Sequence, residues 1–322
     1  MDNIYSTTLA NIFKSKKLTQ WNETIAGYIF LGPWLICFLV FTALPFIGSF
    51  ALSFTEYNIL SPPKFVGLRN YINLIFNDPL FWISLSVTFQ FVFRSVPLRL
   101  VFALLIALLL NRKSKFVALY RCVYYLPSIL GGSVAVSVMW KYCFSREGVF
   151  NIFLNSIGIP STISWVSNRD TALWSIVLLY IWQFGSSMLI FLAGLKQIPA
   201  SYYEAATVDG AGTLTRFFRI TLPLLSPIIL FNLIMQIISG FMVFTQVMII
   251  TEGGPMNRTL VYILYLYQQS FRYYRMGYGS AMAWIMLVIV AVLTALVFKS
   301  SNVWTFYESR SGGEKIKNRT VK

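Results

Sequence analysis

The chain has 322 residues, of which 57% are hydrophobic and only 11% are charged, and its mean hydropathy is +0.67. These values exclude an ordinary soluble domain and indicate an integral membrane protein with several spans. The formal net charge of +15 does not indicate nucleic-acid binding, because the Lys and Arg residues form short clusters beside apolar stretches and no basic–aromatic patch.

Six apolar stretches are each long enough to cross a bilayer, which takes about 20 residues. They cover residues 25–53, 81–110, 116–140, 171–195, 224–250 and 280–298. The first stretch is longer than the apolar core of a cleaved signal peptide, so it indicates an uncleaved span. The sequence thus predicts an all-α membrane protein with a polar segment 1–24, a six-span domain 25–298 and a basic tail 299–322.

The chain contains no His, and its three Cys residues are isolated from one another. The absence of His removes the commonest metal ligand and the usual general base at neutral pH. Isolated cysteines indicate neither a disulfide framework nor a thiolate metal site. No Gly-x-x-x-x-Gly-Lys-Ser/Thr run is present to cradle nucleotide phosphates. We therefore expect no cofactor, no metal and no catalytic activity in this chain.

The stretch between the fourth and fifth predicted spans has the most specific wording in the chain. It reads Glu204-Ala205-Ala206-Thr207-Val208-Asp209-Gly210-Ala211 and ends with Ile220-Thr221-Leu222-Pro223. The pattern predicts two short helices at an angle, with Ser201 capping the first and Glu204 as its capping-box partner. Gly210 permits the reversal, and Pro223 is placed where the next apolar helix starts.

This stretch resembles the EAA loop of binding-protein-dependent ABC importers, and its Asp-Gly-Ala extension resembles the carbohydrate branch, of the maltose type with a MetI-like transmembrane fold. The segments Phe65–Tyr71 and Gly253-Gly254-Pro255 are similar to sugar-importer permeases as well. The resemblance covers nearly the whole chain, from Ile25 to Phe298. It implies that separate ATPase subunits dock on a cytoplasmic coupling loop. The residues implied in coupling are Glu204, Ala205, Ala206, Asp209, Gly210, Leu222 and Pro223.

The resemblance also implies a set of partners. These are a homologous second permease forming a heterodimer, two ATP-binding subunits that hold ATP and Mg²⁺, an extracellular solute-binding protein, and a sugar or oligosaccharide substrate. The alternatives are a permease for a non-sugar solute such as glycerol phosphate, and an ion-coupled secondary transporter. The sequence disfavours the second alternative, because no Asp, Glu or His lies in a predicted span to relay protons.

Lys and Arg residues beside the spans predict the orientation. With the N-terminus inside, sixteen of them fall in inner segments and eight in outer ones. The positive-inside rule therefore places both termini and the coupling loop in the cytoplasm. We expect a multi-pass protein of the plasma (inner) membrane of a bacterium or archaeon.

Polar groups on the spans that flank the coupling loop are the candidates for a substrate path, because such groups are costly in lipid. The fourth span offers Trp182, Gln183 and Ser186, with the last two expected on one helical face. On the fifth span a stripe recurs every four residues, at Asn232, Gln236 and Gly240. Maltose-type importers, which the chain resembles, place sugar contacts in this region. Hydrogen bonding between helices is the alternative role.

Arg94 and Arg99 lie well inside the second span without a carboxylate in any span to neutralise them. They lie about 140° apart around a helix, so they do not share a face. Their partners could be backbone carbonyls, the companion permease, lipid phosphates or an anionic substrate. Together with Arg272 and Arg275 near the outer mouth, they support the hypothesis that the substrate is an acidic oligosaccharide, such as a uronate-containing fragment.

Overall fold

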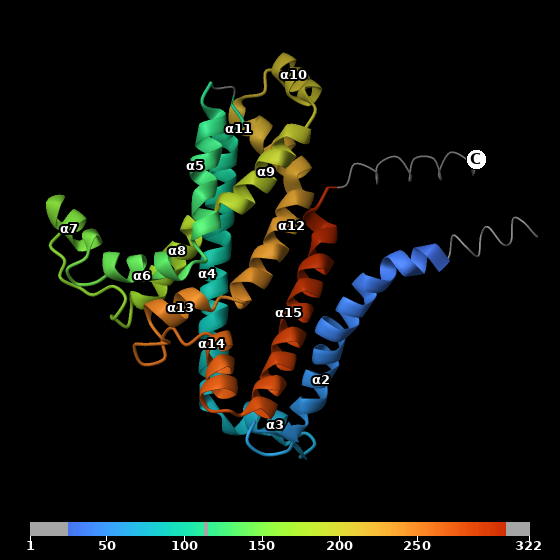
Figure 1. Cartoon of the computed structure of the whole chain (residues 1–322). Coiled ribbons are helices and arrows are strands. Elements are labelled where there is room, and N and C mark those ends of the chain that lie inside the picture. The colour runs from blue at the N-terminus through green and yellow to red at the C-terminus, as the bar shows by residue number, and fades with distance from the viewer. Residues whose placement is uncertain (1–24, 113–114, 307–322) are drawn as a thin grey trace, which may run out of the picture.

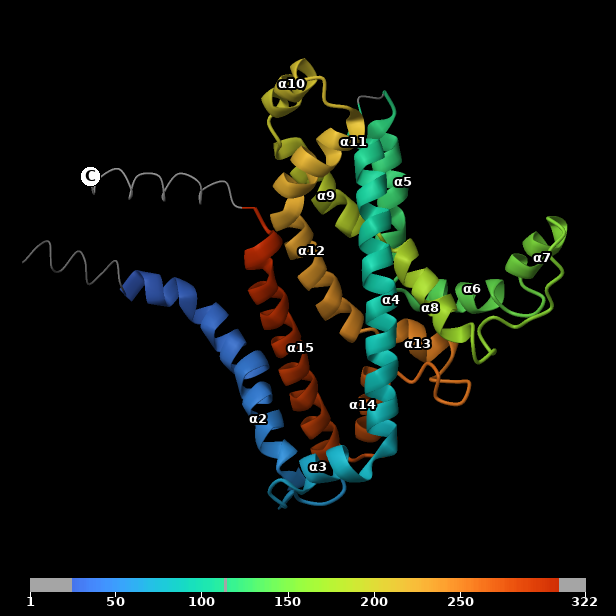
Figure 2. The same cartoon turned by 180° about the vertical axis from the view of Figure 1, so that it is seen from behind.

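The computed structural model describes residues 25–112 and 115–306. The predicted N-terminal segment 1–24 and residues 307–322 of the predicted tail lie outside this part of the chain. The described residues are mostly helical, and the long helices run side by side along one direction (Figure 1; Figure 2). The predicted all-α membrane class therefore agrees with the structure.

Among the described residues, four helices are long and apolar enough to cross a membrane, and two bent pairs bring the possible number of spans to six. The four helices are Ile25–Ser53, Pro79–Leu110, Thr213–Ile250 and Met276–Trp304. The pair Val117–Leu130 and Val134–Cys143 meets at 96°, and the pair Ala172–Trp182 and Gly185–Gln197 meets at 42°. Each predicted span thus has a helical counterpart, but two of the six are broken.

The elements shown in Figure 1 follow in chain order. Up to the second bent pair they are η1 (Leu39–Ala43), α2 (Leu44–Ser53), β1 (Thr55–Glu56), β2 (Lys64–Phe65), α3 (Arg69–Ile72), η2 (Asn73–Asn77), α4 (Pro79–Leu110), α5 (Val117–Leu130), α6 (Val134–Cys143), α7 (Val149–Ser156), α8 (Ala172–Trp182) and α9 (Gly185–Gln197). The remainder are α10 (Ala200–Val208), α11 (Thr213–Arg216), η3 (Phe217–Thr221), α12 (Leu222–Phe241), α13 (Thr245–Ile250), α14 (Tyr262–Tyr267), η4 (Gln268–Arg272) and α15 (Met276–Trp304). Elements labelled η are π-helical turns.

The helix α4 is the axis of the bundle, since it packs against α8, α9, α12 and α14. Its first turn is fixed by Asp78, whose Oδ1 accepts hydrogen bonds from the backbone N–H groups of Leu80 (3.0 Å) and Phe81 (3.2 Å). Such a cap satisfies donors that a helix start leaves unpaired. Small residues on its buried side, among them Ala103 and Ala107, allow neighbouring helices to approach closely.

The same carboxylate joins three helices. Asp78 Oδ2 accepts hydrogen bonds from the hydroxyls of Tyr265 (2.6 Å) and Tyr278 (2.5 Å), while Gln269 donates to the Tyr265 hydroxyl (2.8 Å). Burial and the bond to Asp78 raise the pKa of the Tyr265 hydroxyl, so it remains a donor at neutral pH. The start of α4, the helix α14 and the start of α15 are held together by this network.

Four predicted spans differ from the helices observed, and one of them, the fourth (171–195), is the bent pair α8 and α9. The third, 116–140, breaks because Gly131 and Gly132 interrupt the helix and Ser133 starts a new one, its Oγ accepting from the N–H of Val136 (3.3 Å). As a result α6 and α7 turn sideways out of the bundle (Figure 1). The fifth, 224–250, belongs to a helix that begins at Thr213 and is interrupted between α12 and α13. The sixth, 280–298, is longer at both ends, so the predicted tail 299–322 starts inside α15.

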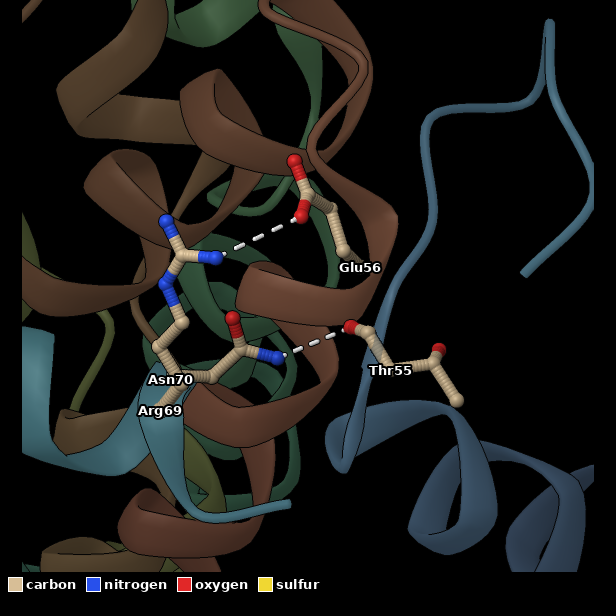
Figure 3. A network of polar contacts seen from close by, with 4 residues as sticks. All are labelled: Thr55, Glu56, Arg69 and Asn70. Carbon is tan, nitrogen blue, oxygen red and sulfur yellow. Dashed lines mark hydrogen bonds and ion pairs between the residues drawn. The ribbon is translucent and has the colours of Figure 1, made fainter. Parts of the chain in front are cut away.

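A short hairpin follows the end of α2 (Figure 3). The strands β1 and β2 pair in antiparallel fashion, with Thr55 opposite Phe65. Asn70 donates from its side chain to the carbonyls of Ser53 (2.8 Å) and Thr55 (2.9 Å). The ion pair between Arg69 and Glu56 spans 3.8 Å with both side chains 67% exposed, so it contributes less than about 1 kcal/mol. The hairpin is therefore held by the buried amide of Asn70.

Candidate functional site

The segment 200–216 forms two short helices at the end of the bundle opposite α3 (Figure 1; Figure 2). The helix α10 is followed by a turn, and α11 continues through the π turn η3 into α12. Leu222 and Pro223 form the first turn of α12 and are half-buried. The predicted pair of helices and the predicted position of Pro223 therefore agree with the structure.

The predicted capping box is wrong. The N-cap of α10 is Pro199, whose extended backbone (φ −59°, ψ 136°) precedes the first helical residue, and no side chain caps this end. Ser201 therefore lies inside the helix. The side chain of Glu204 is exposed, and no ion pair or hydrogen bond joins it to any residue that the structure describes. Its carboxylate is available to a group outside this chain.

The end of α10 is a Schellman turn that depends on Gly210. The backbone N–H of Gly210 donates to the carbonyl of Thr207 (3.1 Å), and that of Ala211 donates to the carbonyl of Ala206 (2.8 Å). Gly210 has φ +74°, the left-handed conformation that this motif requires at the residue after the cap. Asp209 occupies the cap itself and is exposed. The predicted reversal at Gly210 is thus confirmed in its geometry.

Two side-chain contacts hold the segment in place while its tip stays open. The Tyr203 hydroxyl lies 2.9 Å from Thr221 Oγ1, and Arg216 donates to Thr207 Oγ1 at 3.0 Å. The tip exposes apolar side chains, with Val208 89% and Leu214 74% exposed. Ala205 is exposed and Ala206 is half-buried, so neither obstructs an approach to α10. A fixed backbone with an exposed apolar tip is suited to docking another protein.

Breaks in two neighbouring helix pairs meet at Gln183. The α8 helix ends at Trp182, so the carbonyl of Gln183 lacks a partner within its helix and accepts instead from Arg99 Nη2 and from Ser128 Oγ (2.9 Å). The side chain of Gln183 donates to the carbonyl of Gly131, at the break between α5 and α6 (2.9 Å). Backbone carbonyls that the two breaks leave unpaired, at Gln183 and Gly131, thus find hydrogen-bond donors on the neighbouring helix pair.

A second set of contacts continues this arrangement toward α12. The Tyr180 hydroxyl donates to Gln236 Oε1 (3.2 Å), and Gln236 Nε2 donates to Ser187 Oγ (3.0 Å). The guanidinium of Arg99 lies 4.4 Å from the centre of the Tyr180 ring. We call these buried residues the central polar cluster: Arg99, Tyr180, Gln183, Ser187 and Gln236.

The remaining predicted substrate-path residues lie around this cluster. Trp182 is half-buried and its ring lies 6.0 Å from that of Trp140. Ser186 does not share a helical face with Gln183, because the bend separates them, and its N–H donates to Ser128 Oγ (3.1 Å). Gly240 is buried, and a Cβ there would lie 3.1 Å from Val92 Cγ2.

Asn232 differs from the amides of Gln183 and Gln236 in having no partner among the described residues. It is fully buried on α12, and neither its amide nitrogen nor its amide oxygen has a partner among the described residues. Each unpaired polar group of this kind costs about 1–3 kcal/mol. Its predicted role in a substrate path, like that of Gln183 and Gln236, stays a prediction.

The two predicted intramembrane arginines have different surroundings. Arg99 is 6% exposed and held by the Gln183 carbonyl and the Tyr180 ring, so of its predicted partners the backbone carbonyl is the one observed. Arg94 is half-buried on another face of α4, 5.2 Å from the centre of the Trp174 ring. Its Nη2 lies 3.4 Å from Gln90 Oε1.

Sequence reasoning missed Gln90, Ser86 and Tyr180. Gln90 and Ser86 precede Arg94 by four and eight residues on α4. This fourfold spacing is the signal that identified Asn232, Gln236 and Gly240 on α12, and it would have identified these residues as well. Tyr180 gave no such signal, because a single Tyr in an apolar span has no distinguishing pattern.

The sequence profile of the family described as "Binding-protein-dependent transport system inner membrane component" matches residues 61–300. The chain belongs to this family. It is thus a multi-pass membrane component of a transport system, and the resemblance found in the segment 200–223 is confirmed at the level of the family. The matched range extends from the hairpin β1–β2 through most of α15.

Relatives with assigned names cover nearly the full length of the chain. It is 54% identical over 299 residues to the probable ABC transporter permease protein YesP of Bacillus subtilis (strain 168), covering 92% of this chain and 96% of that protein. It is 33% identical to the arabinooligosaccharides transport system permease protein AraP of the same organism, covering 94% and 98%. It is 34% identical to the trehalose/maltose transport system permease protein MalF of Thermococcus litoralis, covering 87% and 95%.

Solved structures show the same fold. A chain from the structure of a bacterial ABC transporter involved in the import of the acidic polysaccharide alginate superimposes with a TM-score of 0.77 at 22% sequence identity. The superposition covers 90% of this chain and all of that one. A second structure of a bacterial alginate ABC transporter, in complex with a periplasmic protein bound to alginate pentasaccharide, gives the same TM-score and covers 88% of this chain.

Proposed function

We propose that the chain is the non-catalytic membrane-spanning subunit of an ATP-driven importer for oligosaccharides. In this proposal it forms a heterodimer with a homologous second permease, and two ATP-binding subunits that hold ATP and Mg²⁺ dock on α10 and α11. An extracellular solute-binding protein delivers the substrate. The segment 200–216 and both termini lie in the cytoplasm of a bacterium or archaeon.

The observation that supports coupling most directly is the construction of the segment 200–216. It combines a turn fixed by Gly210, an unpaired Glu204 carboxylate and an exposed apolar tip at Val208 and Leu214. A surface of this kind, at the end of a membrane bundle, favours a protein partner over solvent. Pro223 lies in the first turn of α12, so a partner bound to the segment 200–216 would be connected directly to a long membrane helix.

The substrate class is supported by the relatives. Two of those named above are permeases for arabinooligosaccharides and for trehalose/maltose, and the chain matches each over most of both lengths. These relatives therefore favour a sugar substrate over glycerol phosphate.

Co-purification of the intact complex tests the proposal. The complex, reconstituted in lipid vesicles with its solute-binding protein, is expected to hydrolyse ATP faster when neutral or acidic oligosaccharides are added. Glycerol 3-phosphate is added separately as the control solute. Stimulation by glycerol 3-phosphate alone would replace the proposal with the non-sugar alternative, and failure to co-purify any ATP-binding subunit would refute it.

Accessibility of single cysteines tests the orientation. In a variant in which Cys37, Cys122 and Cys143 are replaced by Ser, a membrane-impermeant thiol reagent is expected to label Cys introduced at Asn257 in intact cells. The same reagent should label Cys at Thr213 only after the cells are permeabilised. Labelling of the Thr213 position in intact cells would reverse the topology.

A further inference from the structure

A polar pocket of about 460 Å³ lies against the N-terminal half of α4, the half distant from α10 and α11 (Figure 1). Helix α4 and two loops line it. The polar and aromatic side chains in its wall are Trp82, Ser86, Gln90, Arg169, Asn257 and Arg258. This chemistry differs from that of the apolar pocket between α4, α12 and α15, which is lined by Phe, Val, Leu and Ile.

A line of polar side chains leads from this pocket deeper along α4. Ser86, Gln90 and Arg94 are successive residues at a spacing of four, so they share one face of the helix. Gln90 Nε2 lies 3.3 Å from Ser86 Oγ, and Arg94 Nη2 lies 3.4 Å from Gln90 Oε1. Both distances exceed the usual range for hydrogen bonds to oxygen, so this line retains capacity for stronger partners. Polar groups in a span are rare unless they face a path or a partner.

Within the described residues Arg94 is held weakly, by a 3.4 Å contact with Gln90 and by the Trp174 ring, whose centre lies 5.2 Å away. Arg99 is occupied by the Gln183 carbonyl, and Arg275 lies over the Tyr278 ring and donates to Gln269 (3.3 Å). By contrast, Arg169 and Arg258 are exposed.

Carboxylates of the described residues form no ion pair with these groups. Within residues 25–112 and 115–306 the ion pair observed joins Arg69 to Glu56, in the hairpin β1–β2. Asp170 and Glu252 are near Arg169 and Arg258 in the sequence, yet neither forms an ion pair with them. The pocket and the line above it thus hold three guanidinium groups, from Arg94, Arg169 and Arg258, without a countercharge in the described chain.

Both loops that supply arginines are held by buried polar residues. Asn151 donates to the carbonyls of Arg146 (2.9 Å) and Ile163 (2.8 Å), and its oxygen accepts from Trp165 Nε1 (2.7 Å). These bonds fix the loop that leads to Arg169.

The loop that contains Arg258 is fixed in the same way. Thr259 is fully buried, and its Oγ1 contacts Thr251 Oγ1 (2.7 Å) and the Gly254 carbonyl (2.6 Å). Groups held in position before a ligand arrives lose little freedom when they bind it.

We propose that this pocket, with Arg94 above it, is a binding site for carboxylate-bearing sugar units of the transported oligosaccharide. The proposal rests on the oligosaccharide import proposed above. Guanidinium groups bind carboxylates through paired hydrogen bonds, and Gln90 and Ser86 suit sugar hydroxyls. The rings of Trp82 and Trp174 are 52% and 42% exposed, which leaves apolar faces open to a pyranose ring. Of the four arginines in the sequence-based hypothesis, only Arg94 belongs to this site. Arg99, Arg272 and Arg275 do not belong to it, and Arg169 and Arg258 supply the other anion contacts.

Uptake by the intact transporter tests this site. The probes are a uronic acid trisaccharide and the neutral trisaccharide obtained by reducing its carboxyl groups. Arg94→Gln, Arg169→Gln and Arg258→Gln are each expected to lower uptake efficiency for the acidic probe at least about tenfold, since a charge-assisted hydrogen bond is lost. Uptake of the neutral probe is expected to change less than about twofold by the same criterion. Arg94→Lys should recover part of the loss, because it keeps the charge but not the paired geometry.

Arg272→Gln is the matched control, because Arg272 is an exposed outer arginine that does not line the pocket. Its uptake of both probes should equal that of the unmodified transporter at equal abundance in the membrane. Equal loss of both probes in the three Gln variants would overturn the site and assign the arginines a structural or lipid-binding role. Transport of the neutral probe alone by the unmodified protein would overturn the site while leaving oligosaccharide import intact. Transport of neither probe, without stimulation by any oligosaccharide in the ATPase assay, would refute both proposals.

Discussion

The segment 200–216 and the central polar cluster treat their polar groups in opposite ways. In the first, backbone turns are completed within the segment, while the Glu204 carboxylate and the Val208 side chain face outward. In the second, the polar atoms of Gln183 and Gln236 bond to neighbouring helices of the same chain. The contrast teaches that a polar residue of this protein indicates an external binding partner only when it has no hydrogen-bond or ion-pair partner within its own chain.

The largest expected effect tests the close packing of the cluster. At Gly185 a Cβ would lie 2.6 Å from the Tyr124 carbonyl oxygen and 2.8 Å from Tyr125 Cα, and neither backbone atom can move away easily. Gly185→Val should therefore destabilise the protein by about 3 kcal/mol or more, and little folded complex should survive size-exclusion chromatography. Gly132→Val is the control, since a Cβ at Gly132 meets nothing within 4 Å. Equal melting temperatures for the two variants would contradict the packing described.

The next substitution is expected to lower transport without changing the stability of the protein. Glu204→Lys should leave the melting temperature unchanged, because the carboxylate has no partner in the described chain. Uptake should fall at least about tenfold, because the substitution reverses the charge of a group that we propose contacts an ATP-binding subunit. Glu147→Lys makes the same charge change at an exposed position between α6 and α7 and should retain uptake. Full uptake by Glu204→Lys at normal abundance would remove the coupling role.

Asn232 sharpens the comparison, because it is buried like the cluster yet unpaired like Glu204. Asn232→Leu removes two unsatisfied groups and should raise the melting temperature, by an amount corresponding to about 1–3 kcal/mol. Uptake should fall, because an amide left unpaired in this state is available to a sugar hydroxyl in another. Gln236→Leu should lower the melting temperature instead, since Tyr180 and Ser187 lose a partner. A lowered melting temperature in both variants would show that Asn232 is structurally paired.

The smallest expected effects compare an exposed and a buried polar group in the hairpin shown in Figure 3. Glu56→Gln removes an exposed ion pair and should change the free energy of unfolding by less than about 1 kcal/mol. Asn70→Ala removes a buried donor from two carbonyls and should cost about 1–3 kcal/mol. Thermal melting of both variants in detergent checks this order. The reverse order would mean that the ion pair, rather than the amide, holds the hairpin.

Local patterns predicted much of the fold and of the segment 200–216. Apolar length located the four long helices and the two bent pairs, because the bilayer sets a minimum length for each span. Gly210 and Pro223 each impose a backbone restriction that is independent of distant contacts, so their roles could be predicted from neighbours in the sequence. Ser201 failed as a cap because Pro199 already ends the extended backbone one residue before α10 begins.

The rest depended on contacts between residues far apart in the sequence. Gln183 and Ser186 were expected on one face, but the bend between them is stabilised by Arg99 and Ser128 from other helices, and no local pattern contains that information. The acidic-substrate hypothesis paired Arg94 with Arg99 because both lie in one span. Their environments differ because Arg99 is buried against Tyr180 and Gln183, whereas Arg94 meets the half-exposed Trp174 ring. The loops that supply Arg169 and Arg258 become neighbours only through folding.

The bonds around Gln183 also have a mechanical meaning. Its side chain binds the Gly131 carbonyl at one break, and its own carbonyl lies at the other, so the two bends are fastened at a common point. If the two bends were independent, α6 and α8 could move separately. Because these bonds join the two bends, α6 and α8 are expected to move together. On one side of this shared point α9 leads to α10, and on the other α8 leads back to the loop with Arg169. A rotation of α9, caused by a protein that docks on α10, would thus move α8 and α6 together.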